Sequence, residues 1–222
     1  MKIADRIIFY PGIEGFKIIT SNTYLICDDI LTVVDPGHIG QLKTLLQHLR
    51  QDEIRVEDIK LIVNTHSHFD HCSANLPLQR TSKAKIAIHR LEEEYLERSQ
   101  EIARRFGDDL HSFKADQYLQ EGEELTTGAL TFQIIHTPGH TPGSICLYEP
   151  NLKLLISGDT IFPHGNIGRV DLPGGNPAQL VKSVKRLSRL DVMILAPGHM
   201  EVAMEAVNEQ IKASLRSAES LL

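Results

Sequence analysis

The stretch Leu61-Ile62-Val63-Asn64-Thr65-His66-Ser67-His68-Phe69-Asp70-His71 joins an apolar run to a cluster of imidazoles and a carboxylate. Three histidines and one aspartate within six positions suit a hydrophobic core poorly, but they are side chains that bind divalent metals. Folds of the α/β class often place binding sites where strands end. The stretch therefore predicts a buried strand ending in a metal site, rather than a His-rich surface loop.

The spacing inside this cluster indicates more than one metal position. His66 and His68 lie two residues apart, so an extended backbone would point both side chains the same way. Asp70 lies two residues further along, and His71 would point elsewhere unless the chain turns. One short segment can therefore feed two adjacent metal positions.

Composition indicates one α/β domain over residues 1–222, with 41% hydrophobic residues. The chain has no apolar run of about 18 residues, so we expect no membrane span. Its start does not have the pattern of a secretory signal. A net charge of −6 without a basic cluster argues against nucleic-acid binding. The three cysteines have no C-x-x-C pattern and indicate a reducing, cytoplasmic compartment.

Short β-branched or apolar runs predict strands at residues 7–10, 16–19, 23–27, 31–34, 61–63, 130–135, 144–148, 154–156 and 192–195. Helical periodicity predicts helices at about 39–50, 90–113, 177–190 and from 201 onward. Strands followed by helices thus occur twice. This order favours a four-layer αββα sandwich, with two mixed β-sheets flanked by helices, over a single parallel sheet.

The charged segment at about 90–115 predicts a helical insert that Gly107 breaks. It could cover a site as a lid or pack outside, and both alternatives stay open at this point.

Three other histidines, His48, His89 and His111, lie on expected element edges, where we expect them to be solvated.

Two metals need more ligands than one six-residue segment can supply. Three candidates, His140, Asp159 and His199, each follow an expected strand within one to five residues and lie beside a glycine. Glycine permits close backbone approach and unusual dihedral angles. The sequence therefore predicts that three later strand ends complete the site.

Together with Asp35 in Val33-Val34-Asp35-Pro36-Gly37, these motifs resemble the metallo-β-lactamase fold superfamily over nearly the whole chain. The resemblance implies one metal held by His66, His68 and His140, and a second held by Asp70, His71 and His199, with Asp159 bridging. It gives Asp35 no ligand role. Asp35 would either support a ligand or the nearby strand-end backbone by hydrogen bonding, or serve as a turn residue before Pro36.

The runs Asp159-Thr160-Ile161-Phe162 and Gly168-Arg169-Val170-Asp171-Leu172-Pro173-Gly174-Gly175 resemble the glyoxalase II-like branch. This implies a hydrolase that attacks a small thioester or ester-like carbonyl compound with a metal-bound hydroxide, with Asp70 as ligand and proton shuttle. The nitrogen and oxygen ligands suit two zinc ions, with iron or manganese possible. Only 23 residues follow His199, too few for the C-terminal domain of hydroxyacylglutathione hydrolases, which puts glutathione specificity in question.

Other functions use the same residues. One is a mononuclear iron oxygenase resembling persulfide dioxygenases, with the iron on His66, His140 and Asp159. Others are a lactonase, a β-lactamase or a non-catalytic metal-binding protein. Arg169 could bind a substrate carboxylate or pair with Asp171 to pin a loop, and His164 could face the pocket or the surface. A small-molecule substrate is expected, and the oligomeric state stays open.

Overall fold

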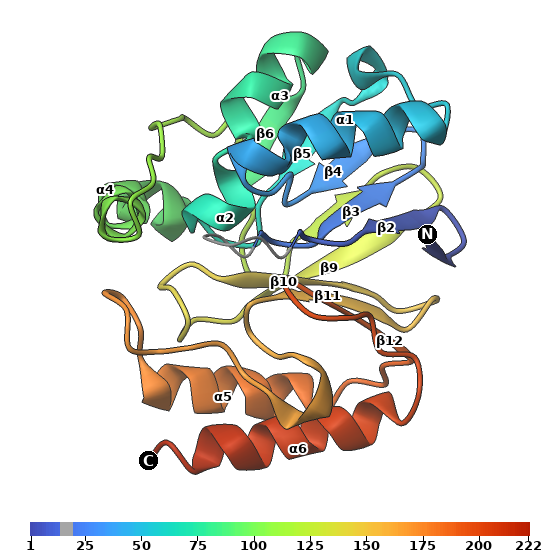
Figure 1. Cartoon of the computed structure of the whole chain (residues 1–222). Helices are drawn as coiled ribbons and strands as arrows, with labels where there is room; N and C mark the ends of the chain where they lie inside the picture. The colour runs from blue at the N-terminus through green and yellow to red at the C-terminus, as the bar shows by residue number, and fades with distance from the viewer. Residues whose placement is uncertain (14–19) are drawn as a thin grey trace.

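The computed structural model describes residues 1–13 and 20–222, which form two β-sheets packed face to face with helices on both outer sides (Figure 1). The seven-stranded sheet has the order β1-β2-β3-β4-β5-β6-β7, and the five-stranded sheet has the order β12-β11-β10-β9-β8. Both sheets mix parallel and antiparallel pairs. The predicted αββα sandwich is confirmed.

The first sheet contains β1 (Lys2–Ala4), β2 (Ile7–Tyr10), β3 (Thr23–Ile26), β4 (Thr32–Val34), β5 (Leu61–Val63), β6 (Lys85–Ile88) and β7 (Gln117–Tyr118). The helices on its side of the molecule are α1 (Leu42–Gln51), α2 (Phe69–Cys72), α3 (Asn75–Ser82) and α4 (Arg90–Arg105) (Figure 1). The second sheet contains β8 (Glu124–Thr126), β9 (Thr131–His136), β10 (Ile145–Glu149), β11 (Leu154–Gly158) and β12 (Ile194–Pro197). Its outer face is covered by α5 (Pro177–Leu187) and α6 (Val207–Glu219). Short 3₁₀ turns occur at Ile39–Gln41, Val56–Asp58 and Pro163–Gly165.

The four layers follow from strands that are apolar on both faces. In β3, Tyr24 and Ile26 enter the core between the two sheets, whereas Leu25 enters the core under α1 and α3. In β10, Leu147 lies between the sheets, whereas Cys146 packs toward α5 and α6. Because successive side chains alternate across a strand, each such strand needs an apolar partner on both sides.

The strand directions explain where the site lies. Strands β4 and β5 are parallel, as are β11 and β12. Strand β9 also runs in the direction of β11, because both are antiparallel to β10. The carboxyl ends of all these strands lead into the predicted ligand motifs, so loops distant in sequence can meet at one edge of the sandwich.

Several boundaries differ from expectation. Residues 39–41 form a 3₁₀ turn before α1, and α4 ends at Arg105, just before Gly107 adopts a φ of +75°. The last helix begins at Val207 rather than near 201, because Ala203 first pairs with Leu195 in an isolated β-bridge. The expected strand at 16–19 lies outside the described residues. Within 1–13 and 20–222, no helix is both long and apolar enough to cross a membrane.

Some elements were not predicted: β1, β6, β7 and β8 are short, α2 contains Asp70 and His71 of the ligand cluster, and α3 follows shortly after it. The short helix α2 matters most for the site, because it sets the direction of Asp70 and His71.

Candidate metal centre

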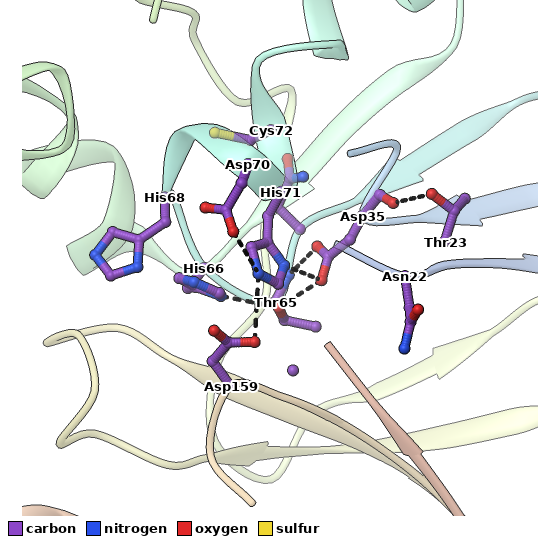
Figure 2. A network of polar contacts seen from close by, with 12 residues as sticks. Asn22, Thr23, Asp35, Thr65, His66, His68, Asp70, His71, Cys72 and Asp159 are labelled. Carbon is purple, nitrogen blue, oxygen red and sulfur yellow. Dashed lines mark hydrogen bonds and ion pairs between the residues drawn. The ribbon is translucent and has the colours of Figure 1, made fainter. Parts of the chain in front are cut away.

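The first ligand segment leaves β5 in an extended conformation and then turns sharply. His68 is still extended, with φ −64° and ψ 145°, and α2 begins at the next residue. This turn brings the His71 ring back to within 4.1 Å of the His66 ring, measured between centroids. The chain therefore does turn: His71 contacts Asp70 and Asp159 (Figure 2), whereas His68 lies beside His66 and His140.

Later strand ends complete three overlapping groups of side chains, of which one, His66, His71 and Asp159, links the other two. In each group, one potential ligand atom per residue lies within 4.8 Å of the others. We call His66, His68 and His140 the histidine group, and Asp70, His71 and His199 the mixed group.

Asp159 lies between the two groups. Its Oδ1 is 3.3 Å from His71 Nε2, whereas its Oδ2 is 3.7 Å from His140 Nε2 and 3.4 Å from His199 Nε2. One carboxylate thus reaches both groups.

Asp35 supports the centre without belonging to either group. Its Oδ1 accepts a hydrogen bond from the Thr65 amide at 2.8 Å, and its Oδ2 accepts one from the Thr65 hydroxyl at 2.7 Å. The same Oδ2 lies 2.9 Å from His71 Nδ1 (Figure 2). This contact leaves His71 Nε2 facing the centre, which is how carboxylates commonly orient metal-binding imidazoles. Of the two roles expected for Asp35, the geometry favours the supporting one.

The glycine of Pro197-Gly198-His199 is required by close packing. A Cβ atom at Gly198 would collide with Asp159 Oδ1 and would lie 2.8 Å from His71 Cε1. Any larger residue would therefore displace two of the converging side chains.

The donor atoms are well placed around a possible metal ion but poorly placed to hydrogen-bond with one another. His140 Nε2 lies 2.9 Å from His68 Nδ1, and His71 Nε2 lies 3.2 Å from His199 Nε2. Among the described residues, His66 Nε2 and Asp159 Oδ1 are buried without any hydrogen-bond partner. Buried polar atoms rarely stay unpaired, and ring nitrogens that converge in this way are satisfied by a bound cation.

Two imidazoles of the histidine group, His66 and His68, are kept uncharged by their surroundings. Burial holds the pKa of His66 well below its ordinary value, and the adjacent His71 ring lowers it further. Burial likewise lowers the pKa of His68 to about 3, with an added contribution from the His140 ring. Both imidazoles are therefore neutral at neutral pH, which is the form that binds metal.

The mixed group is a network of opposite charges. Burial would lower the pKa of His199, but the carboxylates of Asp159 and Asp70 outweigh it and raise the pKa to about 10. Burial also opposes ionisation of Asp70, yet His71 and His199 bring the pKa of this carboxyl down to about 2. Metal binding here therefore competes with protons on imidazole.

A pocket of about 540 Å³ opens over both groups. His68, Asp70, His140, Asp159 and His199 form part of its lining, and most of the remainder is apolar: Phe69, Ile102, Phe106, Phe162, Ile167, Leu172 and Met200. Ile102 lies in the last turn of α4 and Phe106 caps that helix, so the segment expected as an insert forms one wall of the pocket.

The two substrate-binding candidates lie in different places. Arg169 lines the pocket, but its guanidinium forms two hydrogen bonds to Asp171 at 2.8 and 2.6 Å, and its carbonyl oxygen accepts one from His140 Nδ1 at 2.8 Å. His164 is exposed, pairs with Glu201 at 2.6 Å and is not among the residues that line the pocket.

The expectation that His89 is solvated is wrong. Its side chain is buried, its Nδ1 accepts a hydrogen bond from the Leu91 amide at the start of α4, and its ring stacks on His136 at 4.4 Å.

Two supporting residues were missed by sequence reasoning. Asn22 donates to the carbonyl oxygens of Pro197 at 3.0 Å and Met200 at 2.7 Å, and so holds the turn that carries His199. Glu92 is completely buried and contacts the segments that carry the histidine group. The one sequence signal for the burial of Glu92 is helical phase, because Glu92 lies on the same buried face of α4 as Leu96, Ser99 and Ala103.

Known proteins share this arrangement. A family model described as metallo-beta-lactamase superfamily matches residues 18–199. The chain is 39% identical to a protein of Methanocaldococcus jannaschii named a probable metallo-hydrolase, over 82% of this chain and 89% of the other. It is 35% identical to the hydroxyacylglutathione hydrolase GloC of Haemophilus influenzae, over 80% and 84% of the two chains. A crystal structure of a protein in a di-iron-bound form superposes with a TM-score of 0.75 at 29% identity, covering 94% of this chain and 96% of the other.

Proposed function

Because the chain belongs to the metallo-beta-lactamase superfamily, and because Asp159 reaches both ligand groups, we propose a metal-dependent hydrolase with two divalent ions that cleaves small thioesters or ester-like substrates. The observation that carries this proposal is the convergence of seven imidazole and carboxylate side chains below an open pocket. A structural role alone would not require buried donor atoms without partners.

We assign one ion to the histidine group and one to the mixed group, with Asp159 contacting both. Nitrogen and oxygen donors without thiolate suit zinc, and also iron or manganese. The solved relative in a di-iron-bound form supports keeping iron as the second choice.

When bound, the two ions would activate a water molecule as the nucleophile and polarise the carbonyl group that it attacks. Asp70 lines the pocket with its side chain 18% exposed, and its Oδ2 lies 3.2 Å from His199 Nε2. Its low pKa keeps it ionised, so Asp70 can accept the proton of the attacking water and return it to the departing thiol or alcohol.

The relative named hydroxyacylglutathione hydrolase GloC supports a thioester substrate. The short C-terminal segment argued against glutathione thioesters. That argument weakens, because the matched region spans 84% of that relative, leaving it little room for an additional domain. Hydroxyacyl thioesters of glutathione are therefore the first substrates to test.

The test pairs elemental analysis of the purified protein with assays of hydroxyacylglutathione and other thioesters, lactones, nitrocefin and glutathione persulfide. We expect two transition-metal ions per chain and fastest turnover of a thioester. Lactone or nitrocefin turnover above that of every thioester would favour the lactonase or β-lactamase alternative. One iron per chain with oxygen uptake would favour the oxygenase, and no bound metal under any loading condition would refute the proposal.

Substitution of Asp70 by Asn tests its role directly. We expect kcat to fall about 10²–10⁴-fold, because an amide cannot accept the proton. The metal content of the histidine group should persist, which elemental analysis checks. Asp5→Asn is the matched control, because the exposed Asp5 pairs with Lys2 and Arg6, away from the residues that line the pocket. Equal kcat values for the two variants would contradict the assignment.

A further inference from the structure

Glu92 is a buried carboxylate in the first turn of α4, with no exposed surface. Its Oε2 accepts hydrogen bonds from the amide and the hydroxyl of Ser67, both at 2.7 Å. Its Oε1 accepts one from the Gly143 amide, also at 2.7 Å. Among the ion pairs of the described residues, none involves Glu92, so its charge is balanced by hydrogen bonds alone.

The partners of Glu92 place it behind the histidine group. Ser67 lies between His66 and His68, and Gly143 lies in the turn that follows His140. One carboxylate therefore ties together the two segments that carry all three imidazoles, although these segments are more than 70 residues apart in sequence. Two of the three contacts are to backbone amides, so Glu92 fixes the ligand-bearing backbone itself.

The fit around Glu92 is close. A Cβ atom at Gly143 would lie 2.8 Å from Glu92 Cγ and 2.8 Å from the Glu92 amide nitrogen, so only glycine allows this turn to approach α4. The Ser67 hydroxyl also lies 2.9 Å from the Ser99 hydroxyl, about two turns further along the same face of α4. The helix is thus anchored to the metal-binding segment at two points.

A neutral glutamine at this position would offer one acceptor oxygen and would turn its own N–H toward one of the three donors, so the anchor requires a carboxylate, whose burial has a cost. The histidine group contains no negative charge of its own, whereas the mixed group contains Asp70. We propose that Glu92 is a positioning residue of the histidine group: it sets the spacing of the three imidazoles through Ser67 and Gly143, and its negative charge favours a cation among them. This inference rests on the proposed metal centre.

The experiment compares Glu92→Gln with Glu93→Gln. Both remove one negative charge from α4, but Glu93 accepts hydrogen bonds from the Ala115 amide at 2.6 Å and the Tyr118 hydroxyl at 3.1 Å, away from the ligand segments. Metal-free protein is titrated with Co²⁺, and the visible absorption of the bound ion reports its coordination. Wild type and Glu93→Gln should bind two ions with the same spectrum.

For Glu92→Gln we expect the affinity of one ion to fall on the order of 10–100-fold and its absorption band to change, with the second ion retained. Ser67→Ala, which removes one of the three hydrogen bonds and keeps the charge, should weaken the same ion to a smaller extent, and it serves if Glu92→Gln does not fold. Unchanged affinity and spectrum in these variants would overturn the inference. Failure of the wild type to bind Co²⁺ would instead refute the metal centre.

Discussion

The histidine group and the mixed group differ in how the protein holds them. The histidine group is buried, with His66 at 0%, His140 at 2% and His68 at 5% exposure, and α4 supports it from behind through Glu92. In the mixed group, Asp70 and His199 are partly exposed in the pocket, and Asn22 of the first sheet supports the His199 turn. The partly exposed group is the one with side chains able to exchange protons with a substrate.

The two groups of the centre therefore depend on different parts of the fold. Asp35 is the exception, because it contacts both the His71 ring and the Thr65 backbone that precedes His66. Variants at Asp35, Asn22 and His89 should therefore separate the two groups, with effects that decrease in this order.

Asp35→Ala should have the largest effect and should weaken both groups. The change leaves the Thr65 amide, the Thr65 hydroxyl and His71 Nδ1 without their buried acceptor. We expect metal affinity to fall on the order of 10–100-fold, and the free energy of unfolding to fall by about 1–3 kcal/mol. Metal titration and urea unfolding measure the two effects.

Asp35→Asn is the control for this change, because it keeps the shape of the side chain and one oxygen acceptor. It should retain more stability than Asp35→Ala but should still lose metal affinity. A loss confined to one of the two ions would show that Asp35 serves a single group.

Asn22→Ala should weaken only the mixed group. The variant removes the hydrogen bonds to Pro197 and Met200 and the one accepted from the Gly12 amide at 3.0 Å. We expect a loss of about 1–3 kcal/mol in the free energy of unfolding, and weaker binding of one ion. Co²⁺ titration distinguishes the ions.

Asn22→Asp provides the comparison, since it keeps the acceptor for Gly12 but loses both donors. It should resemble Asn22→Ala in metal binding. If either variant weakens the binding of both ions equally, the His199 turn is not supported separately from the histidine group.

The convergence of the candidate ligands could be predicted from sequence because each one follows a strand and lies next to a signal that is visible locally. His140, Asp159 and His199 all neighbour glycine, and the later strand ends were found within a few residues. The His71 side chain could reach the other candidate ligands only if the chain turned after His68, and α2 provides this turn. Lys85–Ile88 was missed, although strands of similar length such as Leu61–Val63 were predicted, because Lys85 and Ala87 are residue types that are uncommon in strands.

The supports could not be predicted in the same way. Glu92 is one of three consecutive glutamates, and Glu93, its neighbour, makes hydrogen bonds of similar length elsewhere. Asn22 reaches carbonyl groups 175 and 178 positions away. Hydrogen bonds from side chains to distant backbone leave no periodic pattern, so only tertiary structure identifies which polar residue becomes buried.

The smallest effect on the metal centre should come from His89, and it should appear on the α4 side as the pH falls. Burial, together with the stacked His136 ring, lowers the pKa of His89 from 6.5 to about 4. The folded state therefore favours the neutral ring. The stabilisation from His89 is complete above pH 6.5 and is lost as the pH falls from 6.5 toward 4. Protonation would also remove the acceptor that caps the Leu91 amide.

His89→Asn separates this contribution from other acid effects, because Asn also caps helices but does not titrate. At pH 7.5 the variant should differ from wild type by about 1 kcal/mol or less, and the difference should shift in favour of the variant as the pH falls to 4. Thermal unfolding measures this shift. Hydrogen exchange should show α4 opening before α6, since His89 caps only α4. If both helices lose protection in parallel, acid acts on the whole fold and not on the side that carries Glu92.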